Sequence, residues 1–319
     1  MEHRPEHLPD DSVRAGLARL GIHATELSYA AVGFGDHHWY VTATDGTRWF
    51  ATVADLENKP HCGDGAAAAL AGLRSAMETA VRLRAAGLEF VVAPFGEPVV
   101  ELGDRYALSV FPVVEGTSGH FGQEMAAGDG VLVQELLARL HTTRVDAPAW
   151  SIDPPALRMD GVWSDGPYAE QARRLVDEHE SMIRKRFEEF ERLAEGVRGA
   201  AVVVTHGEPH PGNLIRGAAG FHLVDWDTVG VAVPERDLSV LTDNPAELAR
   251  YQELTGHEPS ADALRLYRLR WHLNDLVEFV DWFREPHTDD PDTVLAWTSF
   301  QETLAALGQT TTGVSGCGT

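Results

Sequence analysis

The sequence predicts an α+β protein of two lobes, with a small antiparallel sheet in the N-lobe (residues 1–111) and mostly helices in the C-lobe (residues 112–309). Strand patterns and turn residues dominate the first part, and helical periodicity dominates the second. Residues 200–228 interrupt the helices with two apolar strands and polar loops. A length of 319 residues suits two lobes at roughly 150 residues per domain. The Gly/Ser/Thr-rich tail, residues 310–319, is expected to be flexible.

In the N-lobe, we expect a five-stranded antiparallel sheet and one helix. Asp45-Gly46 between two β-rich runs is a strong hairpin pattern. The Ala- and Leu-rich segment 66–86 predicts the helix, and Gly87 ends it. The candidate strand runs are 29–32, 39–43, 48–53, 90–92, 99–102 and 106–111.

The C-lobe should be built from long helices. Apolar residues recur with helical spacing in segments 130–144, 168–197 and 245–309. A short connector near residues 111–116 separates them from the strand-rich part.

Composition excludes several classes of partner. The formal net charge of −23 argues against nucleic acid and anionic membranes, which need Lys and Arg to neutralise phosphates. It favours a cationic small molecule, or simply solubility. No apolar stretch of about twenty residues predicts a membrane span, and the N-terminus has no apolar signal core. Cys62 and Cys317 fit no metal or disulfide pattern. We therefore expect a cytoplasmic protein.

Two neighbouring segments carry the residues suited to chemistry. In HGEPHPGN (206–213), Glu208 and Asn213 lie five residues apart in a polar loop after an apolar strand. A second apolar strand ends in Asp225 and Asp227. Carboxylate and amide oxygens suit Mg²⁺, which prefers such ligands together with substrate phosphates. A carboxylate there can accept a proton from a hydroxyl. The combination favours phosphoryl transfer.

HGEPHPGN followed by LVDWDT (223–228) resembles the aminoglycoside phosphotransferase family, a branch of the protein-kinase-like fold. The run PERDL (234–238) looks most like the spectinomycin phosphotransferase branch. The resemblance spans about residues 25–300. It implies a bilobal kinase-like fold, Mg²⁺ as cofactor and ATP or GTP as phosphoryl donor.

The same resemblance assigns roles in the C-lobe. Glu208 takes the position of the catalytic base, and His206 orients the catalytic loop. Asn213 and Asp225 match the metal-binding positions. Asp227 either helps to hold the metal or accepts a hydrogen bond from the loop. Glu208 departs from the family, which has Asp there. A misplacement of about 1 Å can cost about 100-fold in rate, so either the loop is retuned for Glu, or catalysis is slow, or Glu208 only positions the substrate.

For the nucleotide, the resemblance points to three places. Gly33, Gly35 and His38 match part of a glycine-rich phosphate loop, although a turn without that role is the alternative. The backbone of Phe111 and Val113 would meet the purine.

The third place is the strand position that holds a phosphate-binding lysine in kinases. Thr52 stands there, which puts nucleotide affinity in doubt. Lys59, in the following loop, is a cation that could take the place of that lysine.

Asp275 and Glu278, three residues apart on a predicted helix and flanked by Trp271, have two readings. They form either a solvated face or an acidic wall for substrate ammonium groups.

The sequence thus predicts phosphorylation of a hydroxyl on a small cationic natural product, with an antibiotic such as a spectinomycin-like aminocyclitol or another aminoglycoside as first candidate and resistance as the outcome. One alternative is a kinase of another antibiotic or a metabolite in a producer organism. The other is a catalytically dead kinase-like regulator, which Thr52 and Glu208 favour and the intact pair Asn213 and Asp225 argues against.

Overall fold

A computed structural model describes residues 4–5, 7–33, 35–120, 122–123, 125–126, 128–158 and 160–309. The expected flexible tail, residues 310–319, lies outside the described residues. The chain forms two compact units, Met1–Trp150 with Ala201–Pro259 and Ser151–Ala200 with Ser260–Thr319. The lobe boundary near residue 111 stays a prediction.

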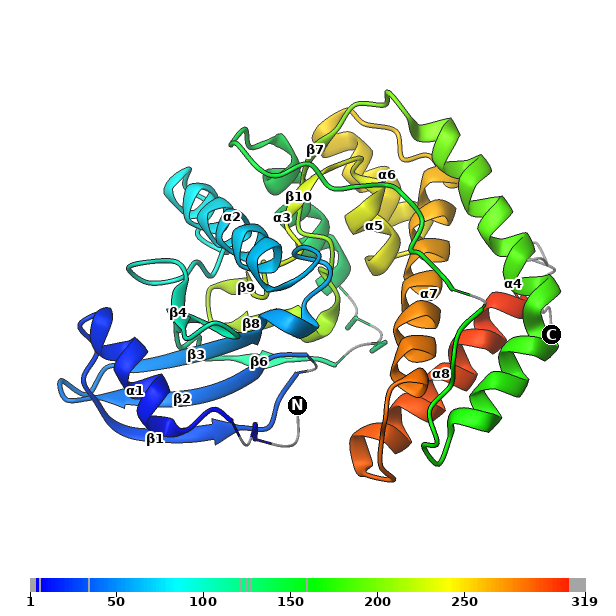
Figure 1. The fold of residues 1–319 in the computed structure, drawn as a ribbon. Helices are drawn as coiled ribbons and strands as arrows, with labels where there is room; N and C mark the ends of the chain where they lie inside the picture. The colour runs from blue at the N-terminus through cyan, green and yellow to red at the C-terminus, as the bar shows by residue number, and fades with distance from the viewer. Residues whose placement is uncertain are drawn as a thin grey trace. The chain divides into compact units, whose positions relative to one another are not determined.

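The first unit contains the expected five-stranded antiparallel sheet (Figure 1). Its strands lie in the order β1-β2-β3-β5-β4, with bounds β1 Ala24–Ala30, β2 His37–Ala43, β3 Arg48–Asp55, β4 Val100–Leu102 and β5 Tyr106–Pro112. The hairpin predicted at Asp45-Gly46 is confirmed. Gly46 adopts a φ of +82°, and the Asp45 carboxylate accepts from the Thr47 amide at 2.9 Å.

One face of this sheet is covered by a helix that the sequence analysis did not expect. Helix α1 (Asp10–Arg19) buries Val13 and Leu17 in a core with Trp39, Val53 and other sheet residues. The expected helix, α2 (Ala66–Ala85), is present as well. The N-terminal part therefore has two helices rather than one, because the short amphipathic segment before β1 is needed to cover the apolar side of the sheet.

The strand expected at residues 90–92 is wrong. Val91 forms only an isolated parallel bridge with Leu223. The Val92 amide donates to the Leu223 carbonyl, and the Leu223 amide donates to the Phe90 carbonyl. This segment therefore attaches to the hairpin before Asp225 and is not a strand of the five-stranded sheet.

The first unit also contains two short sheets, one of β6, β8 and β9 and one of β7 and β10. Strand β7 leads into the loop of residues 206–213, and β9 leads into Asp225 and Asp227. The bounds are β6 Thr117–Ser118, α3 Asp129–Thr142, β7 Val203–Thr205, β8 Leu214–Gly217, β9 Gly220–Leu223, β10 Gly230–Ala232, α5 Glu235–Leu241 and α6 Pro245–Thr255, with the 3-10 helices η1 Leu56–Asn58 and η2 Pro211–Asn213.

The second unit is helical. Its long helices are α4 (Ala169–Val197), α7 (Ala261–Arg284) and α8 (Pro291–Gln309), and α7 packs against both others (Figure 1). The expected helical region 245–309 is divided into three helices, because Gly256 ends α6 in a left-handed conformation and residues 285–290 separate α7 from α8. None of the described helices is both long and apolar enough to cross a membrane.

Candidate active site

The loop between β7 and β8 is fixed from inside by His206. Its side chain is completely buried and donates from Nε2 to the Val224 carbonyl at 2.9 Å. Its Nδ1 accepts from the Glu208 amide at 3.2 Å, and its ring meets Trp226 edge-on. Burial lowers the pKa of His206 to about 4, so the ring stays neutral in this arrangement. His206 thus ties the backbone at Glu208 to the backbone before Asp225.

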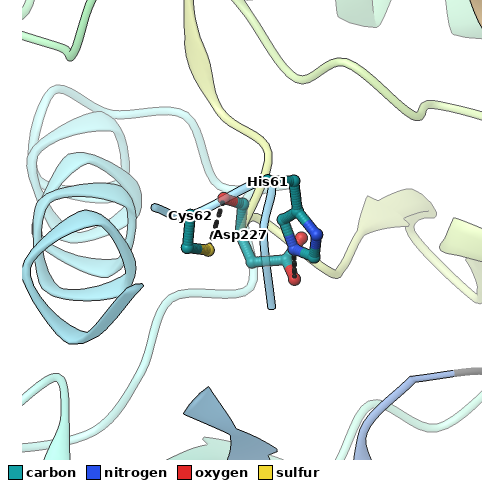
Figure 2. A group of neighbouring side chains, drawn as sticks. All are labelled: His61, Cys62 and Asp227. Atoms are coloured by element: carbon teal, nitrogen blue, oxygen red, sulfur yellow. Dashed lines mark hydrogen bonds and ion pairs between the residues drawn. The ribbon is translucent and has the colours of Figure 1, made fainter. Parts of the chain in front are cut away.

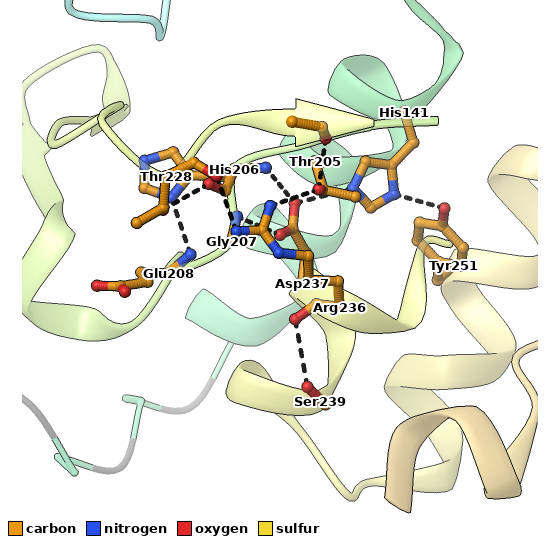
Figure 3. A network of polar contacts seen from close by, with 11 residues as sticks. His141, Thr205, His206, Gly207, Glu208, Thr228, Arg236, Asp237, Ser239 and Tyr251 are labelled. Atoms are coloured by element: carbon orange, nitrogen blue, oxygen red, sulfur yellow. Dashed lines mark hydrogen bonds and ion pairs between the residues drawn. The ribbon is translucent and has the colours of Figure 1, made fainter. Parts of the chain in front are cut away.

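Asp237 holds the same loop from the other side (Figure 3). Its carboxylate, at the start of α5, accepts from the His206 amide at 2.8 Å and from the Gly207 amide at 2.6 Å. His141 of α3 donates from Nε2 to the same carboxylate at 3.0 Å, and the Tyr251 hydroxyl lies 2.6 Å from His141 Nδ1. Burial raises the pKa of Asp237, but the hydrogen bond and charge of His141 outweigh it and lower that pKa, so the group is an ionised acceptor.

Gly207 is required by what lies beside it. Its φ is +103°, and a Cβ there would stand 2.1 Å from Nη2 of Arg236. The Arg236 guanidinium donates to the Thr205 hydroxyl and the Thr228 carbonyl, and it stacks 3.7 Å from the Trp150 ring centre. The run that resembles the spectinomycin branch therefore supplies, in Arg236 and Asp237, the support of the loop of residues 206–213.

Asn213 and Asp225 are brought together by the backbone. The Val224 amide donates to the Asn213 carbonyl at 3.0 Å, and the Asn213 side-chain amide donates to the Glu208 carbonyl at 3.0 Å. This leaves the Asn213 side-chain oxygen as its acceptor atom. Asp225 has a φ of +65°, and it is the one residue other than glycine with positive φ among those that the structure describes. Such a conformation costs about 1–3 kcal/mol and is typical of functional sites.

Lys59 lies in this site, although it comes from the loop after β3. Its side chain is only 4% exposed, and Nζ lies 2.8 Å from a carboxylate oxygen of Asp227 and 2.9 Å from each oxygen of Asp36. Burial alone would lower the pKa of Lys59, but the charges of Asp227 and Asp36 outweigh it and hold that pKa well above its ordinary value.

His61 and Cys62 follow Lys59 and meet the same aspartate (Figure 2). His61 Nε2 lies 3.0 Å from the Asp227 carboxylate, and Cys62 Sγ donates to the Asp227 carbonyl at 3.7 Å. Burial opposes the charged form of His61, yet Asp227 outweighs it and raises the pKa well above its usual value. His61 is therefore an ion-pair donor to Asp227 in this arrangement. The loop can approach α2 this closely because Gly72 has no side chain. A Cβ at that position would lie 1.8 Å from the Cys62 carbonyl oxygen.

The charge in this region fits a divalent cation. Burial by surrounding protein and then repulsion from Asp227 raise the pKa of Asp225 well above its ordinary value, and Glu208 and Asp36 raise it further. Several carboxylates thus act on one another around a single lysine. Hard cations such as Mg²⁺ prefer oxygen ligands and would relieve this repulsion. The carboxylate of Asp225 and the amide oxygen of Asn213 provide such ligands.

Gly33 and Gly35 lie in the turn between β1 and β2, with φ values of +71° and +92°. His38, on β2, places its Nδ1 3.1 Å from the Thr52 hydroxyl, and its ring stacks on Phe50. Burial lowers the pKa of His38 to about 4, so it is a neutral neighbour of the turn and not a replacement for a cation. Residue 34 lies outside the described part of the chain.

The other predicted residues have the following places. Phe111 pairs with Phe50 near the end of β5, and Val113 directly follows that strand. Trp271, Asp275 and Glu278 lie on α7 in the second unit, at spacings that share one helix face. Trp271 and Asp275 are half-buried and Glu278 is exposed.

Asp36, His61, His141 and Tyr251 are among the participants that were not identified from the sequence as parts of the site. Asp36 adjoins the predicted glycine pair, but nothing in the sequence links it to Lys59. His141 and Tyr251 come from helices whose periodic patterns predict only packing. In the sequence, His141 and Tyr251 stand out only as polar side chains on otherwise apolar helix faces, and this pattern alone does not identify a site residue.

Buried neutral histidines predict stability that falls on acidification. The pKa is about 4 in the folded chain for His38 and His206, against 6.5 for the free side chain. Above pH 6.5 both states are neutral, but between pH 6.5 and about 4 only the unfolded chain takes up a proton. The free energy of unfolding should therefore fall with decreasing pH by about 1.4 kcal/mol per pH unit for each histidine.

Urea unfolding at pH 7, 6 and 5 measures this slope. His38→Gln should make the slope shallower, whereas His23→Gln, at an exposed position, should leave it as in the unmodified chain. Equal slopes for all three proteins would contradict the prediction.

Comparison with known proteins connects this geometry to a family. The sequence profile of the phosphotransferase enzyme family matches residues 26–269. Protein StrN of Streptomyces griseus is 29% identical over 322 residues, covering 92% of this chain and 87% of that protein.

Two solved structures share the fold. A spectinomycin phosphotransferase in complex with ADP and spectinomycin aligns with a TM-score of 0.71 at 15% identity, over 94% of this chain and 98% of that one. An amicoumacin kinase in complex with AMP-PNP, Ca²⁺ and amicoumacin aligns with a TM-score of 0.58 at 13% identity, over 95% and 94% of the two chains.

Proposed function

Because the chain belongs to the phosphotransferase enzyme family, we propose that it transfers the γ-phosphoryl group of ATP or GTP to a hydroxyl of a small cationic natural product. The first candidate is an aminoglycoside or a spectinomycin-like aminocyclitol. Phosphorylation in the cytoplasm would inactivate such an antibiotic and give resistance.

The observation that carries this proposal is the joint placement of Glu208, Asn213 and Asp225. Hydrogen bonds of His206, and those that join Asn213 to the Glu208 carbonyl and to the Val224 amide, hold the backbone at these three residues close together. Phosphoryl transfer needs a carboxylate that meets the acceptor hydroxyl and two oxygen ligands that hold a cation, because positioning and charge neutralisation supply most of its catalysis.

Each group then has a part. Glu208 accepts or orients the proton of the acceptor hydroxyl. Asn213 and Asp225 would hold Mg²⁺, which neutralises charge on the phosphate oxygens when bound. Asp227 keeps Lys59 and His61 in place beside them.

On the nucleotide side, the turn of Gly33 and Gly35 would approach the phosphates, with His38 and Thr52 beneath it. The backbone at Phe111 and Val113 would meet the purine. Both assignments rest on the family resemblance and on the position of these residues. The two glycines lie in the turn between β1 and β2, Phe111 lies near the end of β5, and Val113 directly follows β5.

The acceptor is proposed from charge. A net charge of −23 favours a cationic compound, and Asp275 and Glu278 with Trp271 would line its pocket. The related structures carrying spectinomycin and amicoumacin support an antibiotic acceptor.

Mass spectrometry tests the proposal directly. The protein is incubated with Mg²⁺, ATP or GTP, and a panel of spectinomycin, other aminoglycosides, and peptide and nucleoside antibiotics. We expect one compound to gain a phosphoryl group. The gain should be lost in Asp225→Asn and kept in the matched control Asp104→Asn, which alters an exposed carboxylate in the β4–β5 turn.

A product that survives in Asp225→Asn would contradict the assigned metal position. A phosphorylated metabolite instead of an antibiotic would support the metabolite-kinase alternative. If no compound is modified and no Mg-nucleotide binds, the result contradicts the proposal and favours the catalytically dead regulator.

A further inference from the structure

Lys59 is unusual for its chemistry and its place. The sequence contains only two lysines, Lys59 and Lys185, among 26 basic residues. Lys185 is exposed on α4, whereas Lys59 is 4% exposed and follows the third strand through η1. A lysine so deeply buried is retained only when its charge is paired, because desolvation of an ammonium group is costly.

Its partners come from two separate segments. Asp36 follows the glycine pair in the turn between β1 and β2, and Asp227 follows β9. Lys59 thereby links the turn expected to meet phosphates with the segment that carries Asp225. Strand β3 itself holds no lysine, and its Thr52 side chain bonds to His38.

Strand β3 has a single cationic side chain, that of Arg48, its first residue. The Arg48 guanidinium is half exposed and pairs with Glu115. It is four residues before Thr52, at the opposite end of the strand from the loop that carries Lys59.

We propose that Lys59 is the cation that contacts the nucleotide phosphates in this chain, and that Asp36 holds it in the nucleotide-free protein until phosphate oxygens replace the Asp36 carboxylate. This inference rests on the proposed function. An ammonium group donates three hydrogen bonds, so Lys59 can keep Asp227 while it exchanges Asp36 for phosphate. The Asp36 carboxylate also repels an incoming phosphate, so it opposes binding in two ways.

The proposal predicts opposite changes in nucleotide affinity when Asp36 and Lys59 are replaced. Asp36→Asn removes the competing charge but keeps the shape of the residue, so nucleotide affinity should rise about 10-fold, the effect of removing one modest charge interaction. Removing the ammonium should lower the affinity about 10- to 100-fold, the loss of one hydrogen bond between charged groups.

The experiment measures the Kd of the full chain for a fluorescent ATP analogue, with and without Mg²⁺, alongside thermal unfolding. Lys59→Met alone leaves two carboxylates without their partner and can impair folding, so the double variant Lys59→Met/Asp36→Asn restores the charge balance. Lys185→Met is the matched control because it removes the other lysine from an exposed helix position.

We expect tighter binding in Asp36→Asn, binding about 10- to 100-fold weaker in the double variant than in Asp36→Asn, and no change in Lys185→Met. If a folded double variant binds as tightly as Asp36→Asn, or if Asp36→Asn binds more weakly than the unmodified chain, the inference is wrong while the proposed function stands. If the unmodified chain binds no nucleotide, the proposed function itself fails.

Discussion

Replacing Asp237 by alanine is expected to lower the free energy of unfolding by about 3–5 kcal/mol and to abolish phosphoryl transfer. The Asp237 carboxylate has no exposure to solvent and accepts from two backbone amides and one imidazole. Alanine would leave the His206 and Gly207 amides without their acceptor inside the protein, and losing one partner of a buried polar network costs this much. The catalytic loop would lose its position as well as its stability.

Urea unfolding followed by circular dichroism measures the stability, and phosphorylated product measures the activity. Asp237→Asn keeps the shape but turns one acceptor into a donor that faces an amide N–H, so it should also be strongly destabilised. Tyr251→Phe removes only the outer hydroxyl of the same network and should cost about 1 kcal/mol, with activity nearly kept. A stable and active Asp237→Ala protein would show that the loop does not depend on this network.

The residues of the candidate site that could be predicted from the sequence lie close together along the chain. His206, Glu208 and Asn213 fall within eight residues, and Asp225 follows one hairpin later. A loop this short brings its members together whatever the rest of the fold does. Their spacing alone therefore indicated oxygen ligands near a carboxylate, and the fold needed only to bring Asp225 beside them.

The ion pair of Lys59 with Asp36 could not be predicted in the same way. These residues are separated by two strands and a turn, and their meeting depends on where η1 directs the chain after β3. The family resemblance placed the expected lysine at Thr52 and offered Lys59 only as a nearby cation, because a strand position carries no information about where the following loop directs its side chains. The contact of Asp237 with His141 likewise joins helices 96 residues apart.

For the fold, local patterns predicted the elements better than their partners. The hairpin at Asp45-Gly46 and the helix α2 are encoded by neighbouring residues, and both are present. Residues 90–92 have the composition of a strand, but they bond to Leu223 because the hairpin of β8 and β9 offers a free edge there. Strand composition thus does not tell which edge a segment will join.

Exchange of Glu208 is the second prediction with a large expected effect. Glu208→Gln keeps the size of the side chain but removes its ability to accept a proton, so kcat should fall about 100- to 10,000-fold, the usual contribution of a general base. Nucleotide affinity should stay nearly the same, because the proposed phosphate contacts come from other residues. Phosphorylated acceptor measured over time gives kcat, and titration with a fluorescent ATP analogue gives the affinity.

Glu208→Asp asks whether the loop is built for the longer side chain. The amide of Glu208 is tied to His206, its carbonyl accepts from Asn213, and Pro209 and Pro211 restrict the backbone that follows. Since this backbone cannot shift to compensate, a carboxylate shortened by one methylene should stand about 1 Å from its place, and kcat should fall about 100-fold. Faster turnover in Glu208→Asp would mean instead that glutamate is a handicap retained at this position, and full activity in Glu208→Gln would remove Glu208 from the chemical step altogether.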